Sequence, residues 1–323
     1  MTLRHLRTGT GRAAAGAIAL VLLLGACGDS DSDGSGGGKD TRITVAALPL
    51  TDSAALYIAR DRGLFKKEGL DVRIQPVQQS IQALPALSKG QVDVIASANY
   101  VTFLQAYEKG TLDVRILAEG VRMAPHMMDV LVPKDSPIKT AAGLQGKKVA
   151  VNILNNIQTL TLNAILDQQG AGRPAYRQIA FPQMGPALEK GQVDAVHAVE
   201  PFDGAIQHDL GARVLVDGGA APVQSLPISG YVTTARYAKQ HPDAAAKFRR
   251  AIEAASAVAA QDPSAVRAEL PKYTKVTAAQ ATSLGLPAYP ASADATQLRR
   301  LVELMRKQGL LKKDVDPSAL LVK

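Results

Sequence analysis

An eight-residue phrase occurs twice in this chain and limits the folds open to it. Residues 87–94 (LSKGQVDV) return 101 residues later as residues 188–195 (LEKGQVDA), with six identities in eight positions. Each copy has the pattern of a helix end, a glycine stop and a buried strand. The strands run into polar residues, Asn99 and Tyr100 in the first copy and Glu200 in the second. Because α/β sheets hold ligands at the carboxyl ends of their strands, the repeat predicts two similar lobes around a shared cleft.

The rest of the chain alternates strands with helices. The patterns predict strands at 42–47, 71–77, 92–96, 114–119, 127–132, 147–151, 176–180, 193–199, 213–217 and 230–234. They predict helices at 53–62, 64–68, 100–108, 140–144, 157–169, 185–190, 202–210, 243–261, 264–270, 277–285 and 294–308, and one before Gly90. An interior proline costs about 3 kcal/mol, so the helix before Gly90 is expected to begin near Leu84 or to kink at Pro85.

This alternation predicts an α/β fold of two lobes, with mostly parallel sheets flanked by helices and a ligand cleft between the lobes. We expect lobe 1 at 42–125 and 231–323, and lobe 2 at 126–230. The chain would cross between them near 122–130 and return near 227–231. Two crossings are typical of a clamp that closes on a solute by hinge motion.

The amino-terminal segment predicts export. Arg4, Arg7 and Arg12 precede an apolar run at 13–24 that is about half the length needed to span a bilayer. The run ends in Leu-Gly-Ala-Cys27, which resembles the lipobox of bacterial lipoproteins, where cleavage leaves a lipidated cysteine. We therefore expect a lipoprotein signal peptide at 1–26 and lipid attachment at Cys27. An ordinary signal with an incidental cysteine is the alternative.

A polar segment follows the cysteine. Residues 28–40 (GDSDSDGSGGGKD) carry no side chain that could anchor them in a core, so we expect a flexible tether at 27–41. Cys27 is the chain's one cysteine, which excludes an internal disulfide. The expected location is the cell membrane, with a lipid anchor on the extracytoplasmic face and the bilayer as a partner through acylated Cys27.

The formal net charge of +8 does not indicate a nucleic-acid partner. The lysines and arginines are scattered and are rarely interleaved with aromatic residues, which make up 4% of the chain. An exported protein also seldom meets nucleic acid. We interpret the charge as a solvated surface.

Four segments resemble one family. Residues 135–151 (DSPIKTAAGLQGKKVAV) resemble its "DSPIKS-x-x-DLKGKKVAV" signature, and residues 58–72 (IARDRGLFKKEGLDV) resemble its "A-x-x-x-G-x-F-x-x-x-G-L-x-V". The two KGQVD copies resemble its repeated "G-x-x-D", and residues 198–202 (AVEPF) resemble its "WEP" turn. The family comprises solute-binding proteins of ABC transporters for nitrate, sulfonate, taurine and thiamine-pyrimidine precursors.

The resemblance implies the type II periplasmic-binding-protein fold and a function. This would be an extracytoplasmic solute-binding lipoprotein that delivers a small organic or oxyanion solute, similar to a sulfonate, nitrate or taurine, to an ABC permease. The alternatives are a receptor for a thiamine-pyrimidine precursor and an enzyme of pyrimidine biosynthesis on the same fold. The chain departs from the family pattern in three places. Val199 replaces an aromatic residue, Gly143-Leu144 stands where the signature has "DL", and residues 78–80 lack the glycine that is often found there.

The candidate ligand-binding residues lie where strands end and helices begin, where free N–H groups favour anions. In lobe 1 they are Thr51, Asp52, Ser53, Gln79, Asn99 and Tyr100. In lobe 2 they are Asn155, Gln158, Thr159 and Glu200. Helix capping is the competing role for many of them. Asp52 and Glu200 favour an amine, whereas the helix ends favour an anion, so the charge of the solute stays open.

The sequence does not favour an enzyme. The histidines lack the spacing of a metal-binding pair, and neither a Gly-x-Ser-x-Gly turn, a phosphate loop nor a dinucleotide fingerprint occurs. We therefore expect no catalytic residue, no metal and no cofactor. A binding lobe that feeds a sensor, which would need a separate partner, is a further alternative.

Overall fold

The computed structural model describes residues 40–322. The predicted signal peptide, the lipid attachment at Cys27 and nearly all of the predicted tether lie outside these residues. The first strand begins at Thr41, one residue earlier than expected, so the last position assigned to the tether belongs to the sheet.

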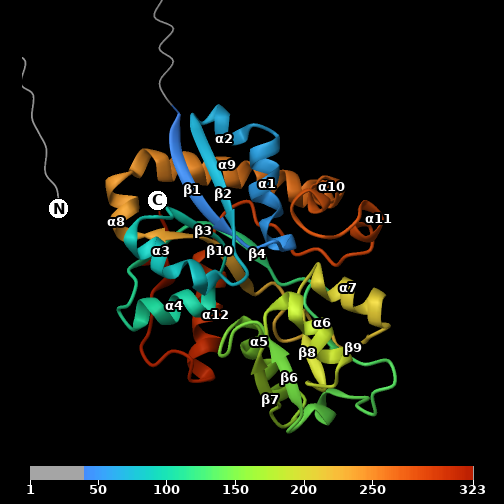
Figure 1. Cartoon of the computed structure of the whole chain (residues 1–323). Helices are drawn as coiled ribbons and strands as arrows, with labels where there is room; N and C mark the ends of the chain where they lie inside the picture. Colours follow the sequence, from blue (N-terminus) through green and yellow to red (C-terminus); the bar gives the residue numbers. More distant parts are fainter. Residues whose placement is uncertain (1–39, 323) are drawn as a thin grey trace, which may run out of the picture. The chain divides into compact units, whose positions relative to one another are not determined.

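The strands and helices alternate along most of the chain (Figure 1). The strands are β1 (Thr41–Ala47), β2 (Leu70–Pro76), β3 (Val94–Asn99), β4 (Val114–Arg122), β5 (Val130–Val132), β6 (Lys148–Val151), β7 (Ala175–Gln178), β8 (Ala195–His197), β9 (Arg213–Val216) and β10 (Pro227–Thr234). The α-helices are α1 (Ala54–Asp61), α2 (Leu64–Lys67), α3 (Leu84–Lys89), α4 (Tyr100–Glu108), α5 (Ile157–Gln168), α6 (Phe181–Glu189), α7 (Phe202–Leu210), α8 (Ala235–Gln240), α9 (Pro242–Gln261), α10 (Pro263–Tyr273), α11 (Ala278–Ala281) and α12 (Ala295–Lys307). Short 3₁₀ helices are η1 (Thr51–Ser53), η2 (Ser80–Ala83), η3 (Ala141–Leu144) and η4 (Pro317–Leu320).

Two five-stranded sheets share one strand arrangement. The first sheet has the order β2-β1-β3-β10-β4, and the second has the order β7-β6-β8-β5-β9. In each sheet the fourth strand pairs antiparallel with both neighbours, while the other pairs are parallel. Four strands of each sheet therefore run in one direction, which confirms the predicted mostly parallel α/β fold. We call the first sheet with its helices lobe 1 and the second sheet with its helices lobe 2.

Helices cover the first sheet because their apolar faces are buried against it and against one another. Helix α9 contacts α1, α2 and β4. Phe248 of α9 is buried, and its ring stacks on that of Phe65 in α2 with centroids 5.4 Å apart. Within residues 40–322, no helix combines the length and the apolar character needed to cross a membrane.

The chain passes from one sheet to the other twice. The first crossing is the segment 123–129 between β4 and β5, within the region that we expected. The return lies at 217–226, between β9 and β10. The residues expected to make the return instead begin β10, and the expected lobe boundary at 230/231 falls inside that strand of the first sheet.

Helices α6 and α11 differ from the sequence patterns for local reasons. Helix α6 begins at Phe181, before the expected 185, because Pro182 lies in its first turn, where a missing N–H costs little. Helix α11 stops at Ala281, although 277–285 was expected. The hydroxyls of Thr282 and Ser283 there hydrogen-bond the carbonyls of Ala279 and Gln280, which competes with a longer helix. Near Pro85 the prediction is confirmed, since α3 begins at Leu84.

Candidate functional site

A cavity of about 40 Å³ lies between residues of the two lobes. A single water needs roughly 10–15 Å³ of such space, so the cavity has room for several waters or a small solute. Its lining consists of Leu48, Leu50, Asp52, Ser80, Ser97, Asn99, Met128, Asn152, Ile153, Asn156, Ile157, Gln158, Phe181, Val199, Ile228 and Ser229.

The polar lining follows the strand ends. Asp52 lies in η1 after β1, Ser80 begins η2 after β2, and Asn99 ends β3. In lobe 2, Asn152 follows β6 directly, and Asn156 caps α5 by accepting a hydrogen bond from the N–H of Gln158 at 3.1 Å. Parallel strands bring their carboxyl ends to one edge, and the strand-to-helix turns place polar groups there.

Three of the predicted residues line the cavity: Asp52, Asn99 and Gln158. The Oδ1 atom of Asn99 caps α4 by accepting from the N–H groups of Val101 and Thr102. The Oε1 atom of Gln158 accepts from the N–H of Asn152 at 2.7 Å, and its Nε2 donates to the carbonyl of His197. The hydrogen bonds of Asn99 and Gln158 thus hold the wall of the cavity in place.

Three further predicted residues lie beside the cavity without lining it. Thr51 donates its N–H to the carbonyl of Glu200 at 3.3 Å, which joins the two lobes. The hydroxyl of Ser53 lies 2.7 Å from that of Ser97 in the wall. Gln79 donates through Nε2 to the backbone oxygen of Asn152 at 2.6 Å, a second contact between the lobes. These contacts give all three residues a structural role at the cleft.

Three other predicted residues, Tyr100, Asn155 and Thr159, do not line the cavity. Tyr100 is buried in the core, and a Cβ atom on Gly230 would lie only 2.0 Å from its hydroxyl oxygen, so the ring packs under β10. Asn155 is exposed, with a positive φ of 55°. Thr159 donates to the carbonyl of Asn156 at 2.8 Å. Their assignment to the ligand stays a prediction.

Ser97 and Ser229 line the cavity but were not among the predicted residues. Ser97 lies inside β3, two residues before Asn99, the polar residue at its end. Ser229 belongs to β10 and reaches the site only because that strand inserts between β3 and β4. A strand pattern gives no local sign of such an insertion, so the sequence carried no signal for Ser229.

Asp52 is the charged residue of the lining. Its side chain is 5% exposed, and Ser229 Oγ donates to its Oδ2 at 2.6 Å. Its Oδ1 accepts no hydrogen bond from residues 40–322. Burial raises the pKa of this carboxyl from 3.8 to about 6, and the Ser229 hydroxyl and the backbone N–H of Asp52 itself oppose that rise. The group is therefore predominantly a carboxylate at pH 7.

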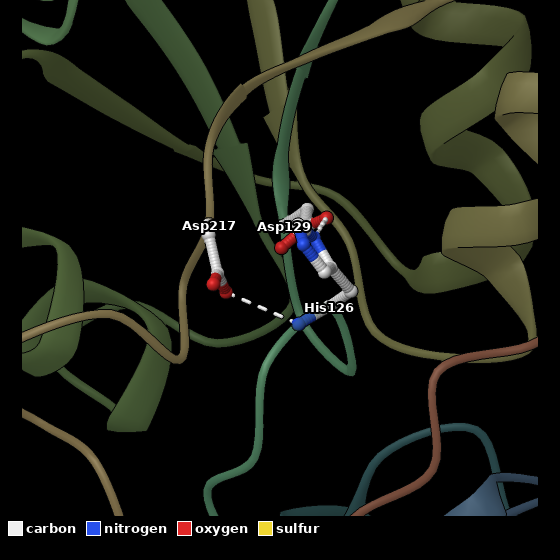
Figure 2. A group of neighbouring side chains, drawn as sticks. All are labelled: His126, Asp129 and Asp217. Atoms are coloured by element: carbon white, nitrogen blue, oxygen red, sulfur yellow. Dashed lines mark hydrogen bonds and ion pairs between the residues drawn. The ribbon is translucent and has the colours of Figure 1, made fainter.

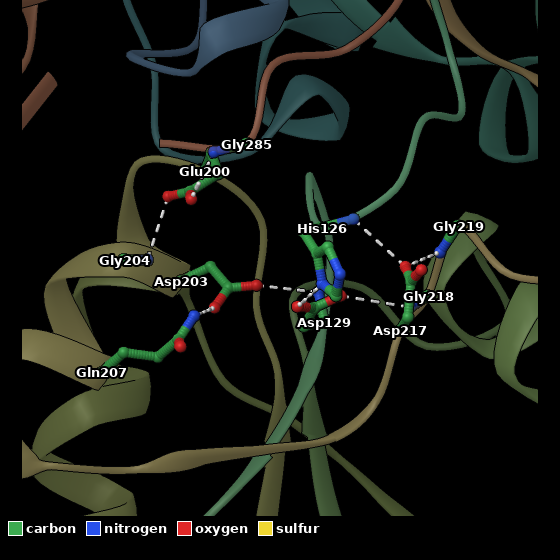
Figure 3. Close-up of polar contacts among 10 residues, drawn as sticks. All are labelled: His126, Asp129, Glu200, Asp203, Gly204, Gln207, Asp217, Gly218, Gly219 and Gly285. Atoms are coloured by element: carbon green, nitrogen blue, oxygen red, sulfur yellow. Dashed lines mark hydrogen bonds and ion pairs between the residues drawn. The ribbon is translucent and has the colours of Figure 1, made fainter. Parts of the chain in front are cut away.

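Glu200 follows Val199 of the cavity lining, and its side chain connects the lobes (Figure 3). Its two carboxyl oxygens accept from the N–H of Gly204 at 2.9 Å and from the N–H of Gly285 at 3.1 Å. Burial, followed by the nearby charge of Asp203, raises the pKa of Glu200 to about 8. The two N–H donors oppose the shift, but burial outweighs them. Its role as a ligand contact stays a prediction, and in the structure it fastens lobe 2 to the segment after α11.

A histidine and two aspartates meet where the chain crosses between the sheets (Figure 2). His126, Asp129 and Asp217 each bring one atom within 4.8 Å of the others, as metal ligands do. However, Asp129 accepts from the Nδ1 side of His126 at 3.0 Å and from the N–H of Gly218 at 3.2 Å. Asp217 Oδ1 accepts from the N–H groups of His126 and Gly219. Because these protein donors already engage both oxygens of Asp129 and Oδ1 of Asp217, we assign no metal to the group.

Two curated relatives match part of the chain. An Escherichia coli protein named as an aliphatic sulfonates-binding protein is 31% identical over 172 residues, which cover 51% of this chain and 52% of the relative. A Haemophilus influenzae protein named for thiamine biosynthesis is 27% identical over 146 residues, or 45% of each chain. The chain thus spans about half the length of the curated relatives it matches.

Solved structures match more of the chain. The alkanesulfonate-binding protein of Xanthomonas axonopodis pv. citri, bound to MOPS, has a TM-score of 0.73 at 19% identity and covers 88% of this chain and 99% of its own. The periplasmic nitrate-binding protein of Synechocystis has a TM-score of 0.70 at 15% identity, covering 87% and 85%. A desulfurization enzyme also matches, with a TM-score of 0.64 at 18% identity and coverage of 87% and 96%.

These likenesses show that the fold is that of periplasmic binding proteins. The model of the family described as NMT1/THI5 like matches residues 50–266. This range includes β3 and β8, which follow the two copies of the repeated phrase, and every residue of the cavity lining except Leu48. The chain belongs to the NMT1/THI5-like family.

Proposed function

We propose that this protein is an extracytoplasmic solute receptor that delivers a small molecule to an ABC permease. The observation that carries the proposal is the cavity itself, whose wall is built from strand ends of both lobes. A solute in that position touches both lobes at once, so it binds a form in which they are together more tightly than a form in which they are apart. Such differential affinity couples binding to lobe closure.

The contacts between the lobes support this coupling. Gln79 donates to Asn152, Thr51 donates to the carbonyl of Glu200, and Gln308 donates to the carbonyl of Leu160 at 2.9 Å. Each hydrogen bond in these contacts is worth roughly 1 kcal/mol net. The binding free energy of a solute is large enough to shift an equilibrium between open and closed lobes that depends on bonds of this size. The permease would then recognise the closed form. The relatives named for sulfonate and nitrate binding point to the same kind of protein.

The proposal includes the anchoring predicted from the sequence. Lipid attachment at Cys27, followed by the polar segment, would hold the receptor at the outer face of the cell membrane. Acyl anchoring of this kind becomes stable when more than one chain is attached.

An enzyme of pyrimidine biosynthesis is the competing function, since one relative is named for thiamine biosynthesis and one similar structure is an enzyme. The lining contains a single ionisable side chain, Asp52, and neither a histidine, a cysteine nor a lysine. General acid–base or nucleophilic catalysis usually needs a second such group to take or return the proton. The lining therefore favours binding over turnover. A receptor for a thiamine-pyrimidine precursor is the same function with a different solute.

Binding to a panel of small solutes tests the proposal. The chain from residue 28 onward would be titrated by calorimetry with sulfonates, nitrate, amines, amidines and pyrimidines, and lobe closure would be followed by small-angle scattering. We expect at least one solute to bind reversibly and to shrink the radius of gyration. A free ligand at a hundred times its Kd adds about 2.7 kcal/mol of stability, which also raises Tm. Chemical conversion of a panel compound, without closure, would instead establish an enzyme.

A further inference from the structure

The charge of the cavity wall indicates which solute the receptor takes. Assuming the receptor function proposed above, we infer that the solute is a small organic cation, such as an amidinium, guanidinium or primary ammonium, whose N–H group donates to Oδ1 of Asp52.

Asp52 is an acceptor that the protein leaves incomplete. Its Oδ2 is held by the hydroxyl of Ser229, while Oδ1 is buried and accepts nothing from residues 40–322. An ionised carboxylate can only accept hydrogen bonds, and burying one without a partner is costly. A cationic N–H donor in the cavity supplies both the missing hydrogen bond and the missing opposite charge.

The rest of the wall carries no positive side chain that could pair with an anion. Its other polar side chains are uncharged: Ser80, Ser97, Asn99, Asn152, Asn156, Gln158 and Ser229. Arginine, lysine and histidine are all missing from the lining. A sulfonate or nitrate in this space would face a buried carboxylate with no positive side chain to offset the repulsion, which is strong at low dielectric.

The apolar part of the wall limits the rest of the solute. Leu50, Ile157 and Phe181, with Leu48, Met128, Ile153, Val199 and Ile228, make up the remaining surface. The cavity is small, so an apolar body of a few atoms attached to the cationic group fits it best. Acetamidine, methylguanidine and ethylamine have this form.

A structural role for Asp52 is the competing explanation. Asp52 lies in η1, directly before α1, where a negative charge is favoured by the helix dipole. That role explains why an acid is tolerated there. It leaves the buried, unpartnered Oδ1 unexplained, because a capping carboxylate accepts from backbone N–H groups.

Calorimetry with paired probes tests the inference. The cations acetamidine, methylguanidine and ethylamine would be compared with ethanesulfonate and nitrate, in wild type and in Asp52→Asn. We expect wild type to bind a cation and Asp52→Asn to lose at least tenfold in affinity for it. Asp209→Asn is the matched control, since it removes the same charge from a side chain that is 64% exposed. This control should leave the affinity unchanged.

The pH dependence gives a second readout that needs no variant. Since the pKa of Asp52 is about 6, affinity for the cation should fall several-fold between pH 7 and pH 5. The titratable groups facing Asp52 are Tyr231, Tyr273 and Tyr289, which burial keeps neutral throughout this range. Glu200 and Asp203 also titrate nearby, so the fall should disappear in Asp52→Asn, which retains both.

The outcomes separate this inference from the receptor function. Tight binding of ethanesulfonate or nitrate without binding of any cation overturns the cationic solute but leaves a receptor. Equal affinity of wild type and Asp52→Asn for a cation also overturns it. Failure of every probe to bind at millimolar concentration counts against both proposals. If Asp52→Asn does not fold, the wild-type pH profile is the deciding measurement: an affinity for the cation that does not fall between pH 7 and pH 5 overturns the inference.

Discussion

At the scale of single residues, the buried carboxyl groups around the cleft have distinct surroundings. Glu200 accepts two backbone N–H groups, whereas Asp203 accepts from the N–H of Asp129 at 2.8 Å and from Gln207 at 2.7 Å (Figure 3). Burial, followed by the charge of Asp129, raises the pKa of Asp203 to about 7. These groups therefore hold protons in the folded protein that they release in the unfolded chain.

Because Glu200 and Asp203 hold protons in the folded protein but release them in the unfolded chain, we expect the free energy of unfolding to fall as the pH rises from about 6.5 to 8.5. The folded protein binds more protons than the unfolded chain in this window, so the free energy of unfolding decreases with pH. Each such group contributes at most about 1.4 kcal/mol per pH unit. His126 acts in the same direction, because its hydrogen bond to Asp129 raises its pKa. Urea denaturation at several pH values measures the slope.

The variant Glu200→Gln should flatten this slope, because it removes the group whose pKa is about 8. Glu303→Gln is a control on α12, where the exposed side chain has no recorded ion pair among residues 40–322. A window below pH 6 is unsuitable, since the buried neutral His197, with a pKa near 4, makes stability rise with pH there. Constant or increasing stability between pH 6.5 and 8.5 would contradict the prediction.

At the scale of elements, side-chain caps decide where helices begin. Asn99 caps α4, Asn156 caps α5 and Asp294 caps α12. The helices α4 and α7 begin and end as the sequence predicts, because a polar or proline residue precedes an apolar pattern. The sequence missed α8, whose start depends on Thr234 at the end of β10 accepting a hydrogen bond from the N–H of Tyr237.

Asp294 allows a test of capping away from the cleft. Its carboxylate accepts from the N–H groups of Thr296 and Gln297. Asp294→Ala should lower the free energy of unfolding by about 1 kcal/mol, the usual value of such a cap. Asp294→Asn keeps the acceptor and should cost only a few tenths. Chemical denaturation compares the two, and equal losses would mean that the cap is not the cause.

At the scale of the whole molecule, closure depends on contacts that join the lobes. Gln79 follows β2 in lobe 1, and its amide donates to both the backbone oxygen and the Oδ1 atom of Asn152 in lobe 2. We expect Gln79→Ala to weaken solute binding by about fivefold, since one hydrogen bond is worth roughly 1 kcal/mol. Lobe stability should fall by no more than the loss of one cap, because Gln79 also forms a capping box with Gln82 at the start of η2.

Gln91→Ala is the matched control, because Gln91 is exposed and its side chain makes no recorded hydrogen bond within residues 40–322. Its Kd should equal that of wild type. Calorimetry with whichever panel solute binds, together with Tm without solute, separates the two effects. An unchanged Kd in Gln79→Ala would show that this contact is equally strong with and without solute.

The sequence by itself determined the alternation of strands and helices, the two related halves and the polar strand ends. These features depend on local periodicity and on short phrases, which residues near one another in the chain specify. The likeness of the two halves is seen again in the shared strand order of the sheets.

Only the tertiary structure decided which polar residues meet. Asp52 reaches Ser229, 177 residues away, because β10 returns to the first sheet and inserts between β3 and β4. The same strand covers Tyr100, whose hydroxyl lies close to Gly230. Pairing between distant strands depends on the packing of the whole sheet rather than on any local pattern, so the chemistry of the cavity emerged only once the chain was folded.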